Sequence, residues 1–136
     1  MHPKRAALRQ TTSSTRDDMP TLASYHDRDL ARQILLCAAE RDPGNALHYL
    51  GLGDLCFSEG RLPEAKFNYR FAILLAPRDA RGYARLGMAY ERSGQYRFAR
   101  TYYRKARFLS PGVTQYGFAI QRVALKCRED VDNEPY

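Results

Sequence analysis

The sequence repeats itself at a spacing of 34 residues, so that residues 46–79 and 80–113 place the same residue types at the same positions. The matched positions are Ala46 and Ala80, Tyr49 and Tyr83, Leu52-Gly53 and Leu86-Gly87, Gly60 and Gly94, Ala65 and Ala99, Tyr69-Arg70 and Tyr103-Arg104, Ala72 and Ala106, and Pro77 and Pro111. A fixed period of this kind is typical of proteins whose small units bury their apolar faces against one another. The period therefore favours a stack of similar helical units over an irregular bundle.

Each repeat is predicted to form two amphipathic helices. In the second repeat, Tyr83, Leu86 and Tyr90 have the spacing of one face of a helix. Gly94 separates this helix from the next one, because glycine readily adopts the left-handed conformation that ends many helices. We expect helices at about 25–41, 46–59, 62–76, 80–93, 96–109 and 114–128.

The same pattern divides the chain into segments. The expected order is a flexible basic N-terminal arm at 1–24, a half-repeat helix at 25–45, two full repeats at 46–79 and 80–113, a C-terminal capping helix at 114–128, and an acidic tail at 129–136. The arm is basic, rich in Ser and Thr and poor in apolar residues, which favours disorder. A terminal unit of a repeat array needs a polar outer face, and the last helix carries one.

These residues resemble the motif of the tetratricopeptide-repeat family, W-x2-L-G-x2-Y…G…A-x3-F…A…P, with Tyr49 and Tyr83 in the tryptophan position. The resemblance covers roughly residues 27–128. It implies an all-α fold, a right-handed superhelix of antiparallel helix hairpins with about six helices. It also implies a non-enzymatic adaptor for protein–protein interactions, and leaves open a chaperone, an assembly factor or a subunit of a larger complex.

Charge is unevenly placed along the chain, whose formal net charge is +7. Residues 60–128 carry fifteen basic residues and three acidic ones, whereas residues 27–59 carry three basic residues and six acidic ones. The C-terminal half is therefore expected to attract an anionic partner. A surface that is merely solvated is the alternative, since net charge alone fixes no partner.

The sequence offers no catalytic or metal-binding motif. Its three histidines lack metal-site spacing, and no phosphate loop, nucleophile elbow or dinucleotide fingerprint is present. The three cysteines are dispersed, which favours a reducing compartment, and Cys56 is expected to be a small core residue. We therefore expect no enzyme, no cofactor, no membrane span and a cytoplasmic location, or an organelle matrix if the basic arm is a presequence.

The family resemblance places a partner on the first helix of each repeat, where a concave groove would hold a protein or peptide segment. The residues expected there are Leu50, Asp54, Phe57, Arg81, Arg85, Met88, Arg92, Phe118, Arg122 and Leu125. Exposed apolar side chains surrounded by arginine are typical of protein-binding sites. We therefore expect a partner segment with apolar anchors and acidic residues; the oligomeric state stays open.

Some family members bind the C-terminal carboxylate of heat-shock chaperones with a clamp of lysine, asparagine and arginine. Arg81 and Arg85 occupy basic positions of such a clamp, but Leu50, Gly51 and Asp54 replace its other polar members. A complete clamp is therefore not predicted.

A second candidate surface lies on the opposite, convex side. Four arginines recur at three- and four-residue spacing along one helix: Arg97, Arg100, Arg104 and Arg107. Guanidinium groups bind phosphates, and Tyr102 nearby could stack on a base. RNA or another polyanion is therefore the alternative partner.

Overall fold

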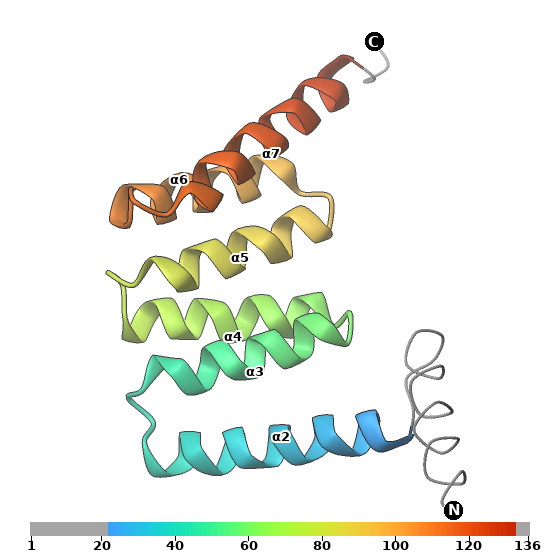
Figure 1. Ribbon diagram of the computed structural model, residues 1–136, viewed down its shortest axis with the longest axis vertical. Helices are drawn as coiled ribbons and strands as arrows, with labels where there is room; N and C mark the ends of the chain where they lie inside the picture. The colour runs from blue at the N-terminus through green and yellow to red at the C-terminus, as the bar shows by residue number, and fades with distance from the viewer. Residues whose placement is uncertain (1–21, 133–136) are drawn as a thin grey trace, which may run out of the picture. The chain divides into compact units, whose positions relative to one another are not determined.

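The computed structural model describes residues 22–132, which form six α-helices and no strand (Figure 1). The helices are α2 (Leu22–Arg41), α3 (Ala46–Ser58), α4 (Leu62–Leu75), α5 (Ala80–Arg92), α6 (Tyr96–Leu109) and α7 (Thr114–Asp132). The predicted all-α fold with six helices is confirmed. No helix in this part of the chain combines the length and hydrophobicity of a transmembrane segment.

The chain divides into two compact units, Met1–Gln33 and Ile34–Tyr136. The described part of the first unit, residues 22–33, is the N-terminal part of α2. The second unit contains the end of α2 and the five helices that follow. All contacts discussed below lie within the second unit.

Two helices are longer than the sequence indicated. α2 begins at Leu22, inside the segment expected to be a flexible arm, and α7 ends at Asp132, inside the expected acidic tail. No proline or glycine interrupts either extension, since Pro20 precedes the first and Pro135 follows the second. The rest of the arm and of the tail lies outside the described residues.

The helix ends of the two repeats are capped in equivalent ways. The side chains of Asn45 and Asp79 each accept a hydrogen bond from a backbone amide at the start of α3 and of α5, in both cases at 3.0 Å. Gly60 and Gly94 have φ angles of 75° and 78° in the turns within the two hairpins, where a side chain would be strained. Both repeats therefore have a side-chain N-cap at the same repeat position, asparagine in one and aspartate in the other, and the same glycine turn.

The hairpins α3–α4 and α5–α6 close around matched small and aromatic residues. A Cβ atom added to Gly53 would meet the Tyr69 ring, and one added to Gly87 would meet the Tyr103 ring. Ala65 and Ala99 are fully buried on the second helix of each hairpin. Because these residues lack bulk, the helix axes approach closely and the two tyrosine rings fill the space between them.

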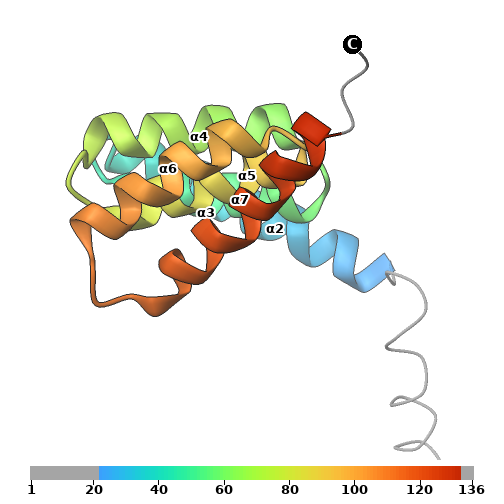
Figure 2. The same cartoon turned by 90° about the horizontal axis from the view of Figure 1, so that it is seen from above.

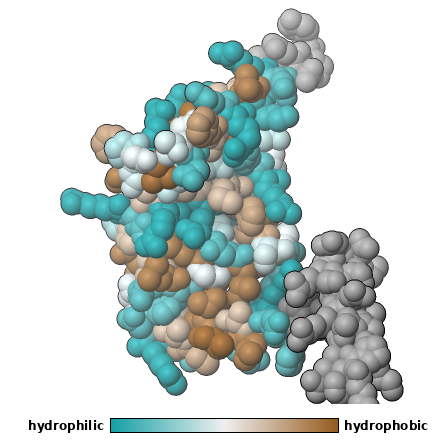
Figure 3. All heavy atoms as spheres, in the orientation of Figure 1, coloured by the Kyte–Doolittle hydropathy of each residue, from teal (hydrophilic) through white to brown (hydrophobic). Residues whose placement is uncertain are grey.

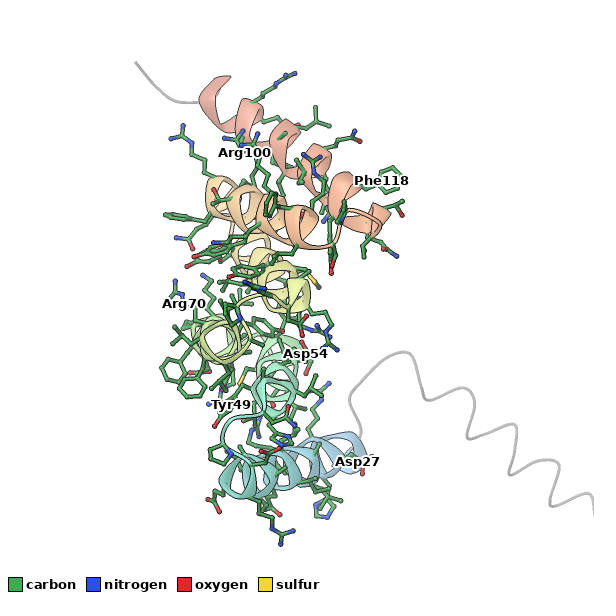
Figure 4. All side chains as sticks on the ribbon, turned by 90° about the vertical axis from the view of Figure 1, so that its left-hand side faces the viewer. Asp27, Tyr49, Asp54, Arg70, Arg100 and Phe118 are labelled. Atoms are coloured by element: carbon green, nitrogen blue, oxygen red, sulfur yellow. The ribbon has the colours of Figure 1, made fainter. Side chains whose placement is uncertain are left out.

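Within the second unit, α4 packs on α5, and α6 packs on α7. α4 and α6 lie on one side of this stack, with α3 and α5 on the other (Figures 1 and 2). We call the outward side chains of α3, α5 and α7 the odd-helix face, and those of α4 and α6 the even-helix face. Asp54 and Phe118 lie on the first, opposite Arg70 and Arg100 on the second (Figure 4).

Candidate functional site

The odd-helix face carries exposed apolar side chains. Met88, Phe118 and Leu125, all predicted to line the partner site, are 45%, 67% and 61% exposed, and Leu47 on α3 is also exposed. On the face that Figure 3 shows, apolar and hydrophilic areas of the described residues alternate. Large exposed apolar side chains of this kind leave room for a partner to bury them.

Two residues predicted to be accessible on this face are buried or half-buried. Leu50 is only 4% exposed and belongs to the core cluster, which contradicts its predicted role in contacting a partner. Phe57 is half-buried and packs against the same cluster. The guanidinium carbon of Arg92 lies 5.1 Å from the centre of the Phe57 ring, so a cation–π contact covers the ring.

Three of the four basic side chains predicted for the odd-helix face are paired with carboxylates of the chain. Arg81 contacts the Asp79 carboxylate at 2.7 Å, and Arg85 reaches across from α5 to Asp54 on α3 at 3.0 Å. Arg122 on α7 pairs with Glu91 on α5 at 2.6 Å. Each of these three arginines has a carboxylate partner in the chain, which reduces the positive charge that the odd-helix face offers to a partner.

Each of these two cross-helix pairs also includes a buried tyrosine. The Tyr69 hydroxyl donates to Asp54 at 2.7 Å, and the Tyr103 hydroxyl donates to Glu91 at 2.7 Å. In both cases the arginine follows the carboxylate by 31 residues. We call each set of tyrosine, carboxylate and arginine an interhelix link, because it joins both helices of one hairpin to the first helix after it.

The interhelix links shift the pKa values of Glu91 and of the two tyrosines. Hydrogen bonds from Arg122 and Tyr103 hold the pKa of Glu91 below its usual range. Burial and the hydrogen bond to a carboxylate raise the pKa of Tyr69 and of Tyr103. Glu91 therefore stays ionised and both hydroxyls stay protonated at neutral pH, as the hydrogen bonds require.

The contribution of the Asp79 N-cap to the stability of the fold can be tested by its dependence on pH. Its pKa is lowered, chiefly by the Arg81 side chain, so its charged form stabilises the fold above its ordinary value of 3.8, and this stability is lost as the pH falls through the lower folded value. Asp79→Asn keeps an oxygen for the cap but removes the titration. We expect the variant to be less stable than the parent at neutral pH, and the difference to vanish at the acid end of a urea-denaturation series. A constant difference at all pH values would contradict this assignment.

The even-helix face has a different character. The Tyr90 side chain of α5 contacts residues of both even helices. From α4, Lys66 Nζ lies 4.5 Å from its ring centre, and the Arg70 guanidinium donates a hydrogen bond to its hydroxyl. Phe98 and Tyr102 of α6 stack on the same ring, with centroids 5.3 and 5.4 Å away. These five residues form what we call the Tyr90 cluster.

The sequence predicted only part of this surface. Arg97, Arg100, Arg104 and Arg107 all lie on α6, and no described carboxylate pairs with them. Lys66 and Arg70 are not among the residues predicted for this surface, although their four-residue spacing puts them on one face of α4. The link between α4 and α6 depends on Tyr90, which sequence spacing assigns only to the core.

Among the described residues, no group of three or more His, Cys, Asp or Glu side chains is placed to hold a metal ion.

Comparisons with known proteins agree with the repeat. The sequence profile of the tetratricopeptide repeat matches residues 80–113. No curated protein sequence matches the chain.

Three solved structures share the fold. The TPR domain of Arabidopsis OM64 superposes with a TM-score of 0.67 at 22% identity, covering 74% of this chain and 85% of that one. The first TPR of Spaghetti (RPAP3), bound to an HSP90 peptide, has a TM-score of 0.72 at 16% identity, with coverages of 76% and 82%. The TPR2B domain of yeast Sti1, in a complex with pHsp70, has a TM-score of 0.66 at 21% identity, with coverages of 79% and 87%. The chain therefore contains a tetratricopeptide repeat at residues 80–113 and shares the fold of tetratricopeptide-repeat domains.

Proposed function

We propose that this protein is a non-enzymatic adaptor that binds a protein segment on the odd-helix face. The observation that carries the proposal is the set of exposed apolar side chains on successive odd helices, Met88 on α5 and Phe118 and Leu125 on α7. The first helices of successive repeats present equivalent faces side by side, so one extended partner segment could contact α5 and α7 together. Burying such side chains is the main favourable contribution to binding of this type.

The structural relatives support a peptide as the class of partner. The Spaghetti (RPAP3) domain is bound to an HSP90 peptide, and the Sti1 domain forms a complex with pHsp70. The present chain differs in its electrostatics, because Arg81 and Arg85 are each paired with an aspartate of the chain. A bound carboxylate would have to compete with these aspartates. We therefore propose recognition through apolar anchors, without a carboxylate clamp.

The interhelix links give this face a fixed geometry. Asp54–Arg85 and Glu91–Arg122 connect α3 to α5 and α5 to α7. An ion pair of this exposure contributes little to stability by itself, about 0–1 kcal/mol. Its value for binding is preorganisation, since helices that are already fixed lose less entropy when a partner binds.

The proposal is tested by removing the anchors together. The variant Met88→Ala/Phe118→Ala/Leu125→Ala should lose the proteins that co-purify with the intact chain, as measured by affinity capture and quantitative mass spectrometry. The three side chains are exposed, so their removal leaves the core intact and the thermal unfolding transition close to that of the parent.

A matched control removes the same number of exposed apolar side chains from the even-helix face. Phe67→Ala/Leu74→Ala/Phe108→Ala alters residues that are at least as exposed. This control should retain the captured proteins. If it loses them while the odd-helix variant keeps them, the partner binds the other side and the proposal fails.

A further inference from the structure

The positive charge of the chain is concentrated on the even helices. α4 and α6 carry seven basic residues and one acidic residue. α3, α5 and α7 together carry six basic and five acidic residues. None of the seven basic residues on α4 and α6 forms an ion pair with a described carboxylate, whereas Arg81, Arg85 and Arg122 on the odd helices all do. Most of the surplus charge available to an external anion therefore lies on the even helices, with six more basic than acidic residues against one more on the odd helices.

The same face presents an aromatic ring that is held in place from below. Phe98 is 56% exposed, and its ring stacks on Tyr90 at an interplanar angle of 28°. Tyr90 is buried, its ring also stacks on Tyr102, and its hydroxyl accepts a hydrogen bond from Arg70. One face of the Phe98 ring is thus packed against the protein while the rest of the ring meets solvent.

From these two observations we propose that the even-helix face binds a single-stranded nucleic acid, with a base stacked on Phe98 and phosphates contacted by the arginines of α6. Arg97, Arg100 and Arg104 lie on successive turns of one helix, about 5–6 Å apart at their Cβ atoms, so they present a row of guanidinium groups. Cationic tracks beside stacking aromatic rings bind single strands without reading their sequence. The inference concerns a different surface from the proposed peptide site and does not rest on it.

The two repeats differ at the centre of this surface. In the first repeat Cys56 occupies the position of Tyr90, and its sulfur contacts the Asn68 side chain. The smaller side chain supports no ring stack there. Only the second repeat therefore combines the packed ring with the row of arginines, which places one strand along α6 and the adjacent edge of α4.

Binding can be measured by fluorescence anisotropy with the full-length protein and end-labelled 20-nucleotide probes, oligouridylate and oligothymidylate. We expect affinity to fall steeply with salt, because every phosphate that is neutralised releases counterions. Arg97→Gln/Arg100→Gln/Arg104→Gln should reduce the slope of log Kd against log salt by about 2, at roughly 0.7 per lost phosphate contact. Phe98→Leu should weaken binding roughly 5- to 150-fold, the range for losing one stacked base.

Two controls separate a site from general electrostatic attraction. Arg81→Gln/Lys126→Gln/Arg128→Gln removes the same charge from the odd helices, and Phe108→Leu removes another exposed ring of α6. Both should bind nearly as the parent does, and circular dichroism melting should show all variants folded. Equal losses in the matched charge variants would overturn the proposal, as would full binding by Phe98→Leu. An acidic amphipathic Glu/Leu helical peptide that binds when neither oligonucleotide does would also overturn it, in favour of an acidic protein partner.

Discussion

Replacing Gly53 with alanine is expected to lower the free energy of unfolding by about 1–3 kcal/mol, the usual cost of overpacking a core. The added Cβ would lie 2.4 Å from the Cε1 atom of Tyr69, closer than non-bonded carbon atoms approach. The Tyr69 ring is only 2% exposed, so it has no open space into which to move. A displaced ring would also weaken the hydrogen bond to Asp54, so the variant strains the α3–α4 hairpin and loosens its link to α5.

Gly117→Ala is the matched control, because nothing lies within 4 Å of the position of its Cβ. Alanine in the interior of a helix is favoured over glycine by about 0.5–1 kcal/mol, so this variant should be more stable than the parent. Urea denaturation followed by circular dichroism measures both changes. A Gly53→Ala protein that gained stability as Gly117→Ala does would contradict the close approach of α3 and α4.

The sequence predicted the hairpins well because their determinants are local or repeated. The caps at Asn45 and Asp79 and the turns at Gly60 and Gly94 need only neighbouring backbone groups. The close contact between helices needs a small residue opposite a large one, and the 34-residue period shows both. Their confirmation follows from this redundancy, since each signal occurs twice.

The candidate sites were less predictable, because spacing identifies a helix face without its depth or its pairing. Leu50 lies one turn before Asp54 on α3, yet Leu50 is buried and Asp54 is exposed. The pairing of Asp54 with Arg85 spans 31 residues and two helices, which no local pattern indicates. For the same reason the expectation of an arginine-rimmed groove did not include the carboxylates that pair with Arg81, Arg85 and Arg122.

The Tyr90 cluster illustrates a further gap between sequence and structure. Lys66 and Arg70 come from α4, Tyr90 from α5, and Phe98 from α6, so three helices must be assembled before the cluster exists. Burial, and secondarily the neighbouring Arg70 guanidinium, lower the pKa of Lys66. Composition alone indicated a basic half of the chain, whereas the structure assigns the surplus charge to one side of the stack.

Glu91→Ala is the second substitution from which we expect a large effect, a loss of about 1–3 kcal/mol of unfolding free energy. Glu91 accepts hydrogen bonds from the Tyr103 hydroxyl at 2.7 Å and from two nitrogens of Arg122 at 2.6 and 2.8 Å. Alanine leaves the buried Tyr103 hydroxyl without its acceptor, and an unsatisfied buried donor carries the full desolvation penalty. The lost contact with Arg122 adds little, because that side chain is more than half exposed.

A second substitution tests whether the hydroxyl is the cause. In Glu91→Ala/Tyr103→Phe neither polar partner remains, and replacing both members of a buried hydrogen bond by apolar groups is often nearly neutral. The double variant should therefore recover much of the stability that the single variant loses. Glu129→Ala is the control for removing a charge alone, since Glu129 pairs with Lys126 on the exposed surface of α7 at 3.3 Å. It should change stability by no more than about 0.5 kcal/mol.

The three variants together distinguish a structural link from a surface ion pair. If Glu91→Ala costs no more than Glu129→Ala, the carboxylate contributes only as an exposed charge, and α5 and α7 are held together by apolar packing alone. If the double variant is as unstable as Glu91→Ala, the stability is lost because the ion pair between Glu91 and Arg122 is broken, and the Tyr103 hydroxyl does not cause the loss. If adding Tyr103→Phe restores stability, the loss in Glu91→Ala comes from the unpaired Tyr103 hydroxyl. The Tyr69 hydroxyl donates to Asp54 in the same way, so substitutions of Asp54 and Tyr69 should then change stability as those of Glu91 and Tyr103 do.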